Sequence, residues 1–131
     1  MGTERKTERY TRNKLISLGY EEDWIEEQKS EIPSIQNLLK TASKKNTGNK
    51  GYPEFIISCK NQEFVIVIEC KKSVTKHESS TRDNPVDYAV DGAIHYASFL
   101  KEEYNVISIA VSGETEKKYK NIKFLMEKKQ R

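Results

Sequence analysis

Residues 63–70 read Glu-Phe-Val-Ile-Val-Ile-Glu-Cys, which places five consecutive apolar side chains between two acids. A strand with one exposed face alternates apolar and polar residues, whereas an uninterrupted apolar run indicates burial on both faces. We therefore expect a central strand that is covered by helices. Residues 54–59, Glu-Phe-Ile-Ile-Ser-Cys, predict a second strand. The residues between them, 60–62, fit a short hairpin turn.

Helical patterns precede this hairpin. Residues 3–17 predict one helix, and residues 20–29 predict a short acidic helix. A further helix begins at Pro33, because apolar side chains follow it at helical spacing. Its last turn is expected to carry a group of basic residues, which suits the negative end of the helix dipole. These residues are Lys40, Lys44 and Lys45.

Another helix and further strands follow the hairpin. Asn84 and Pro85 predict the start of a long helix, since Asn is a good N-cap and Pro suits the first helical position. This helix should run to about Tyr104, and residues 106–111 then form a buried strand. Residues 120–127 fit either a strand or a helix, and we favour the strand. The order predicts an α/β fold in which helices flank a mixed β-sheet.

Length and composition limit the class of protein. The 131 residues are 35% apolar and 33% charged, which suits a single polar domain spanning residues 1–131. No apolar run approaches the roughly 18–20 residues that cross a bilayer, and residues 1–6 lack the apolar stretch of a signal peptide. Cys59 and Cys70 show no CxxC or zinc-site spacing. We expect a cytoplasmic protein with reduced thiols and no membrane partner.

Three residues at the ends of the predicted strands carry the chemistry. Glu54 opens the first strand, and Glu69 closes the second. Side chains alternate along a strand, so Glu69 and Lys71 point to the same side. A hairpin that places Glu54 beside Glu69 brings two carboxylates together near one lysine. Their mutual repulsion is relieved by a divalent cation.

Magnesium suits this set of side chains. Mg²⁺ prefers oxygen ligands and commonly uses two carboxylates together with water and substrate phosphate, and Mn²⁺ can replace it. Such a metal polarises a phosphoryl oxygen and helps to generate hydroxide. The lysine orients the water or stabilises the negative charge that develops on the phosphate.

The pattern Pro53-Glu54, fourteen further residues, then Glu69-Cys70-Lys71 resembles the PD-(D/E)XK nuclease superfamily. Further segments are similar to the N-terminal nuclease region of type I restriction endonuclease R subunits and related restriction–modification proteins. These segments are residues 8–12, 18–20, 38–44, 48–53 and 93–97. The resemblance implies a restriction-endonuclease-like core and a metal-dependent endodeoxyribonuclease of the restriction type.

The resemblance also implies roles for individual residues. Glu54 and Glu69 would be metal ligands and Lys71 the catalytic lysine, while Glu8 matches a first-helix glutamate that completes the metal site. Tyr96 matches the tyrosine of a Gln-x-x-x-Tyr motif, and core packing of this side chain is an equal alternative. Two positions depart from the pattern. Glu54 replaces the commoner aspartate, and glycine, Gly92, stands where the motif has glutamine.

Basic residues near this constellation predict a nucleic-acid interface. We expect double-stranded DNA as the partner, bound by Tyr96 and by the four lysines of two basic stretches that flank the site. These lysines are Lys44, Lys45, Lys50 and Lys72. The alternative is that these lysines are ordinary solvated side chains.

Other interpretations stay open at this point. Glu54 could be an exposed residue at a strand start, and Glu69 with Lys71 could form a surface ion pair of little consequence. The fold could be a non-catalytic module that binds DNA or a partner subunit, or an α/β protein unrelated to nucleic acid. As a nuclease, the chain could be the N-terminal part of a larger restriction enzyme. Methyltransferase, specificity or motor subunits or domains would then be its partners, and a dimer would suit cleavage of both strands.

Overall fold

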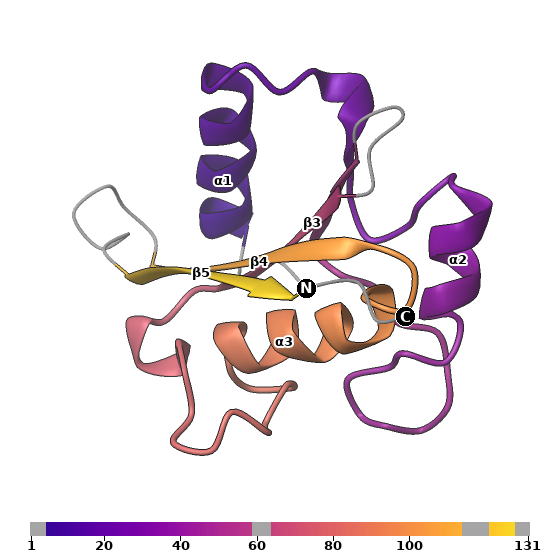
Figure 1. Ribbon diagram of the computed structural model, residues 1–131. Helices are drawn as coiled ribbons and strands as arrows, with labels where there is room; N and C mark the ends of the chain where they lie inside the picture. The colour runs from indigo at the N-terminus through magenta and orange to yellow at the C-terminus, as the bar shows by residue number, and fades with distance from the viewer. Residues whose placement is uncertain (1–4, 59–63, 114–120, 128–131) are drawn as a thin grey trace.

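The computed structural model describes residues 5–58, 64–113 and 121–127 (Figure 1). In these residues five strands form one sheet in the order β1-β2-β3-β4-β5. β3 and β4 run parallel, and every other pair of neighbours runs antiparallel. The strands are Ile25–Glu26, Phe55–Ser58, Phe64–Lys71, Asn105–Ser112 and Asn121–Glu127. The predicted mixed sheet and α/β class are confirmed, and β3 is its central strand.

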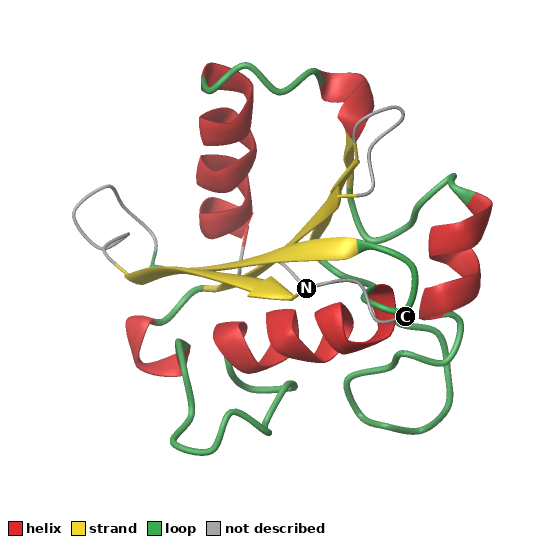
Figure 2. Cartoon of the chain, in the orientation of Figure 1, coloured by secondary structure: helices red, strands yellow, loops and turns green. Residues whose placement is uncertain are grey.

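Helices cover both faces of the sheet (Figure 2). α1 (Arg5–Ser17) lies on one face, and α2 (Pro33–Leu39) and α3 (Ala89–Leu100) lie on the other. The alternation of β3 side chains explains this arrangement. Ile68 and Cys70 pack with residues of α1, whereas Val65 and Val67 pack with residues of α2 and α3. The apolar run is therefore buried on both faces, as its sequence predicts.

Two predicted helices before the sheet differ from the structure. Residues 20–29 do not form a helix, because Ile25 pairs with Ile57 and is buried at the edge of the sheet as part of β1. The segment keeps only one 3₁₀ turn, Glu22–Trp24. α2 ends at Leu39, whose carbonyl accepts hydrogen bonds from the backbone N–H groups of Ala42 and Gly51. The lysines expected in its last turn consequently lie beyond the helix.

The helix predicted from Asn84 to Tyr104 is shorter than expected and spans Ala89–Leu100. The backbone N–H of Asn84 donates to Asp91 Oδ2 at 2.9 Å, and Tyr88 before the helix is extended, with φ −124°. The Asp91 side chain thus holds the preceding segment as a turn instead of a helical one. A second 3₁₀ turn, Val74–Lys76, follows β3.

The two strands predicted after the long helix, including the favoured strand over residues 120–127, correspond to β4 and β5. The predicted turn at 60–62 and Cys59 lie outside the described residues, while Cys70 is a buried free thiol. Within the described part of the chain, the helices are too short or too polar to cross a membrane.

Candidate active site

Glu54 and Glu69 lie beside one another where β2 begins and β3 ends. Phe55 pairs with Ile68 in the antiparallel register, so the next residues outward are Glu54 and Glu69. The backbone N–H of Glu54 donates to Glu69 Oε2 at 2.8 Å. The juxtaposition predicted from the hairpin is therefore present in the structure.

The Glu69 side chain is 1% exposed, yet both of its oxygens have donors. Oε2 accepts the N–H of Glu54, and Oε1 accepts Lys44 Nζ at 2.9 Å. A buried carboxylate without such partners would be costly, because burial removes its hydration. The two donors explain how Glu69 is held inside the protein. The alternative in which Glu69 forms a surface ion pair with Lys71 does not describe this structure, because Glu69 is buried and its ion-pair partner is Lys44.

Glu8 joins the two strand carboxylates from α1. Its side chain hydrogen-bonds to the side chain of Glu54, and both side chains are half-buried. Burial, this hydrogen bond and the negative charge of Glu69 raise the pKa of Glu54 from 4.5 to about 9, although Lys44 opposes the rise. In the metal-free protein the Glu54 carboxyl is therefore protonated and neutral near pH 7. Three carboxyl groups from α1, β2 and β3 share one corner of the molecule.

Lys71 extends from the end of β3 toward the segment that precedes α3. Its Nζ donates to the backbone carbonyl of Val86 at 2.8 Å. The neighbouring Pro85 carbonyl and Glu69 Oε1 both lie 3.2 Å from the point where a Cβ at Gly92 would stand. Lys71 therefore reaches the same corner as Glu69 and is tied to a carbonyl there.

Gly92 brings the backbone of α3 against the Glu69 side chain. A Cβ at this position would lie 3.2 Å from Glu69 Oε1 and 3.3 Å from its Cγ, which is closer than ordinary packing. A side chain at position 92 would require Glu69 or the Pro85 carbonyl to give way, so Gly92 accommodates the Glu69 side chain.

Tyr96 is 2% exposed and lies in the core between the sheet and α3. Its hydroxyl accepts a hydrogen bond from the N–H of Tyr52 at 3.2 Å. Burial raises the pKa of this phenol well above its ordinary value. Gly51 passes so close that a Cβ there would lie 2.7 Å from the Tyr96 ring. Tyr96 positions the chain just before Glu54, and its burial agrees with core packing, the alternative to a DNA contact that the sequence left open.

The four predicted DNA-binding lysines fall into two groups. Lys45, Lys50 and Lys72 are exposed, and the ammonium of Lys50 lies over the Tyr52 ring at 6.0 Å from its centroid. Lys44 instead points inward to Glu69. Lys44 therefore does not join the three exposed lysines in this structure, and a phosphate contact by its side chain stays a prediction.

Two functional features of the α3 side were not apparent from the sequence. His95 Nε2 lies 3.0 Å from the carbonyls of both Ala42 and Ser43, which fixes the loop that carries Lys44. Asp91, which is fully buried, accepts the N–H groups of Ser79 and Asn84 and so fixes the segment that Lys71 contacts. The sequence pattern that could have pointed to these two residues is the presence of an acid and a histidine on the otherwise apolar face of α3.

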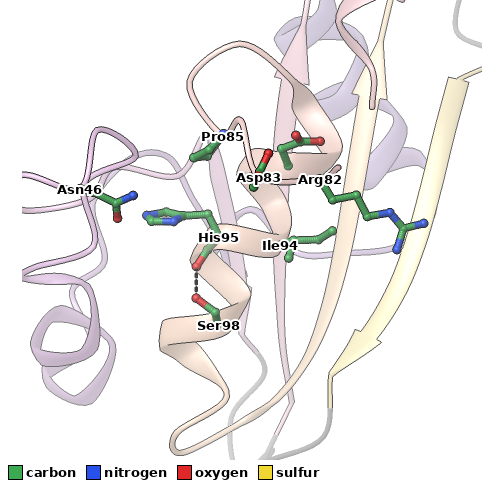
Figure 3. Close-up of a pocket in the computed structure, with 8 residues that line it drawn as sticks. Asn46, Arg82, Asp83, Pro85, Ile94, His95 and Ser98 are labelled. Carbon is green, nitrogen blue, oxygen red and sulfur yellow. Dashed lines mark hydrogen bonds between the residues drawn. The ribbon is translucent and has the colours of Figure 1, made fainter. Parts of the chain in front are cut away.

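A hollow of about 190 Å³ lies on the outer side of α3 (Figure 3). Its lining comes from α3, from the loop after α2 and from the segment before α3, and it includes Asn46, Arg82, Asp83, Pro85, Ile94, His95 and Ser98. None of the three clustered glutamates lines it. The hollow is thus adjacent to the loop of Lys44, and its acidic lining comes from Asp83 and Asp91, not from the three glutamates.

The donor set can be compared with the needs of a metal ion. Within residues 5–58, 64–113 and 121–127, no three His, Cys, Asp or Glu side chains are positioned together to hold one. In this structure both Glu69 oxygens accept hydrogen bonds, one from Lys44 and one from the Glu54 N–H. Mg²⁺ needs only one or two carboxylates when water and phosphate complete its shell. By charge and donor type, Glu8, Glu54 and Glu69 fit such a cation once Lys44 leaves Glu69.

Comparisons with known proteins place this site in context. No family model and no solved structure match the chain. The chain is similar to RM.BcgI, a type II restriction enzyme and methyltransferase of Heyndrickxia coagulans, with 36% identity over 102 residues. The match covers 68% of this chain and 16% of that protein, so the chain spans about a sixth of its relative.

The fold and the comparison together define a class. The chain is an α/β protein whose mixed sheet, flanked by helices, is compatible with a restriction-endonuclease-like core. It is related in sequence to a restriction–modification protein.

Proposed function

We propose that this chain is a metal-dependent endodeoxyribonuclease domain of a restriction system, of the PD-(D/E)XK type. The observation that carries the proposal is the cluster of Glu8, Glu54 and Glu69 at the end of the central strand. The sequence similarity of the chain to a restriction enzyme and methyltransferase supports the same conclusion.

Each residue of the cluster has a role in this proposal. Glu54, Glu69 and Glu8 would hold Mg²⁺ or Mn²⁺, whose chemistry is to polarise a phosphoryl oxygen and lower the pKa of a bound water. Lys71 exchanges its bond with the Val86 carbonyl for one with the substrate phosphate, and it stabilises the negative charge that develops there. Tyr96 and Gly92 act indirectly, since they position the Glu54 segment and the Glu69 side chain.

The proposed substrate is double-stranded DNA, and the proposed partners are methyltransferase, specificity or motor subunits or domains. The relative joins a restriction enzyme and a methyltransferase in its name. Exposed Lys45, Lys50 and Lys72 are the side chains that we assign to phosphate contacts.

Plasmid cleavage tests the function. Wild type, Lys71→Met and Glu69→Gln are incubated with supercoiled plasmid and Mg²⁺ or Mn²⁺. Lys14→Met serves as the control, because Lys14 is exposed on α1 and is not among the lysines assigned to phosphate contacts. Glutamine at position 69 still accepts the Glu54 N–H. We expect the wild type and the control to nick the plasmid in a metal-dependent reaction. The cleavage rates of Lys71→Met and Glu69→Gln should be lower by about 100-fold or more. Equal cleavage by all four proteins would refute the assignment.

A second candidate function is a non-catalytic module that binds DNA or a partner subunit. Lys44 favours it, because its ammonium already neutralises Glu69 without a metal. This candidate predicts salt-sensitive DNA binding together with no affinity for divalent cations. Calorimetric titration with Mg²⁺ and Mn²⁺ therefore distinguishes the two functions.

A further inference from the structure

Lys44 contributes the one cationic side chain that the described structure bonds to Glu69. Its Nζ lies 2.9 Å from Oε1, and its side chain is 21% exposed whereas that of Glu69 is 1% exposed. The contact connects a loop to the end of β3 across 25 residues of sequence. Lys44 therefore supplies the positive charge at Oε1 of the buried Glu69 carboxylate.

The two donors to Glu69 are not equally able to leave. The donor to Oε2 is the backbone N–H of Glu54, which the adjoining β2–β3 pairing holds in place. The donor to Oε1 is the end of a four-carbon side chain that is partly open to solvent. A cation that reaches Glu69 must displace one of the two, and only Lys44 can leave without disrupting the sheet.

The surroundings of Lys44 restrict the movement to its side chain. His95 contacts the carbonyls of Ala42 and Ser43, and the N–H of Ser43 donates to the Asn49 carbonyl at 3.0 Å. The backbone before Lys44 is thus fixed against α3. Gly92 leaves bare helix backbone beside Oε1, so no side chain from that position bonds to this oxygen.

We propose that Lys44 is an exchangeable internal cation, which holds the Glu69 carboxylate in the metal-free protein and leaves it when a divalent cation binds. This inference rests on the proposed function, because it assumes that Glu69 receives a divalent cation. The exchange keeps the charge of the buried carboxylate compensated in both states. The exchange also frees the Lys44 ammonium group to contact a phosphate. Lys44 lies beside Lys45 in the basic loop, the lysine-rich loop that follows α2.

Lysine acetylation of the wild-type protein tests the exchange without a substitution. The protein is treated briefly with an acetylating reagent at increasing Mg²⁺ or Ca²⁺, and acetylation at each lysine is measured by mass spectrometry. Lys45 and Lys50 are internal controls on the same loop, since both are exposed. We expect acetylation of Lys44 to rise about fivefold or more as the cation saturates the site, as for a side chain released from an ion pair. Acetylation at the controls should stay constant.

Calorimetry on Lys44→Met supplies the second measurement, with Lys40→Met as the matched control because Lys40 is exposed just after α2. We expect Lys44→Met to bind Mg²⁺ about tenfold more tightly than wild type, because no ion pair has to be broken first. Constant acetylation of Lys44 while wild type binds Mg²⁺ would overturn the exchange and leave the metal site intact. Absence of metal binding in wild type and both variants would overturn the proposed function and the exchange together.

Discussion

The Glu69 side chain lies inside the protein and links a strand, a loop and the neighbouring strand through two hydrogen bonds. Removing a buried acceptor of this kind leaves its donors unsatisfied, at a cost of about 1–3 kcal/mol for each donor without water. Glutamine keeps one of the two bonds, which is why it suits functional tests better than alanine.

Glu54 gives a pH dependence at the scale of one residue. In the folded protein its pKa is about 9, while in the unfolded chain the ordinary value of 4.5 applies. Between these values the folded state keeps a proton that the unfolded state has lost, so stability falls as pH rises. We expect the metal-free melting temperature in EDTA to decline from about pH 5 to pH 9.

The variant Glu54→Gln should flatten this decline, because glutamine does not titrate. Glu22→Gln, at an exposed carboxylate outside the cluster, is the matched control and should keep the wild-type slope. Circular dichroism melts at several pH values measure both. An identical slope in wild type and Glu54→Gln would contradict the assigned burial and clustering of Glu54.

Sequence alone predicted the proximity of Glu54 and Glu69, because strand alternation and a hairpin register suffice for it. It also placed Glu8 in the site, through the family resemblance. It did not predict the role of Lys44, which depends on where a loop without periodicity folds back. For Tyr96 it left core packing and a DNA contact equally open, since a helical tyrosine can serve either purpose.

At the scale of elements, α3 is the helix that shapes the site. Replacing Gly92 by alanine should gain up to about 1 kcal/mol of helix propensity but lose about 1–3 kcal/mol from crowding against Glu69 and the Pro85 carbonyl. We expect a net loss of about 1 kcal/mol in the free energy of unfolding, measured with urea.

Ser98→Ala is the control for Gly92→Ala, because Ser98 is exposed on the same helix. It should leave stability within about 0.5 kcal/mol of wild type. If Gly92→Ala were instead more stable than wild type, Glu69 would not pack against this turn as described.

The elements that sequence predicted best are the strands with apolar runs, β2, β3 and β4. Short runs of consecutive apolar, mostly β-branched residues such as these favour a buried strand over a helix or a loop. The two-residue strand β1 was missed, because its only signal is the pairing of Ile25 with Ile57. The start of α3 was misplaced by four residues, from Pro85 to Ala89, since Asn84 and Pro85 resemble a helix start while the Asp91 side chain holds them in a turn.

At the scale of the whole molecule, the basic loop after α2 lies on the α3 side of the sheet, whereas α1 covers the other face. We expect the double variant Lys45→Ala and Lys50→Ala to bind double-stranded DNA more weakly. Its plot of log affinity against log salt should be shallower by about 0.9 for each lost phosphate contact.

Fluorescence anisotropy in Ca²⁺ measures this binding, with Lys14→Ala as the control because Lys14 is exposed on α1. The control should match wild type in affinity and salt dependence. Equal losses in the control and the double variant would show that no particular surface binds the phosphates. The position of this surface could be predicted only coarsely from sequence, since lysine-rich stretches do not reveal which ammonium groups turn inward.

Calorimetric titration of the wild-type chain and Glu54→Gln with Mg²⁺ tests the proposed metal site most directly. We expect wild type to bind the cation and Glu54→Gln to bind it at least about tenfold more weakly, because a charged oxygen ligand is lost. Absence of binding by the wild type to both Mg²⁺ and Mn²⁺, or equal affinity in the two proteins, would contradict the proposed metal site.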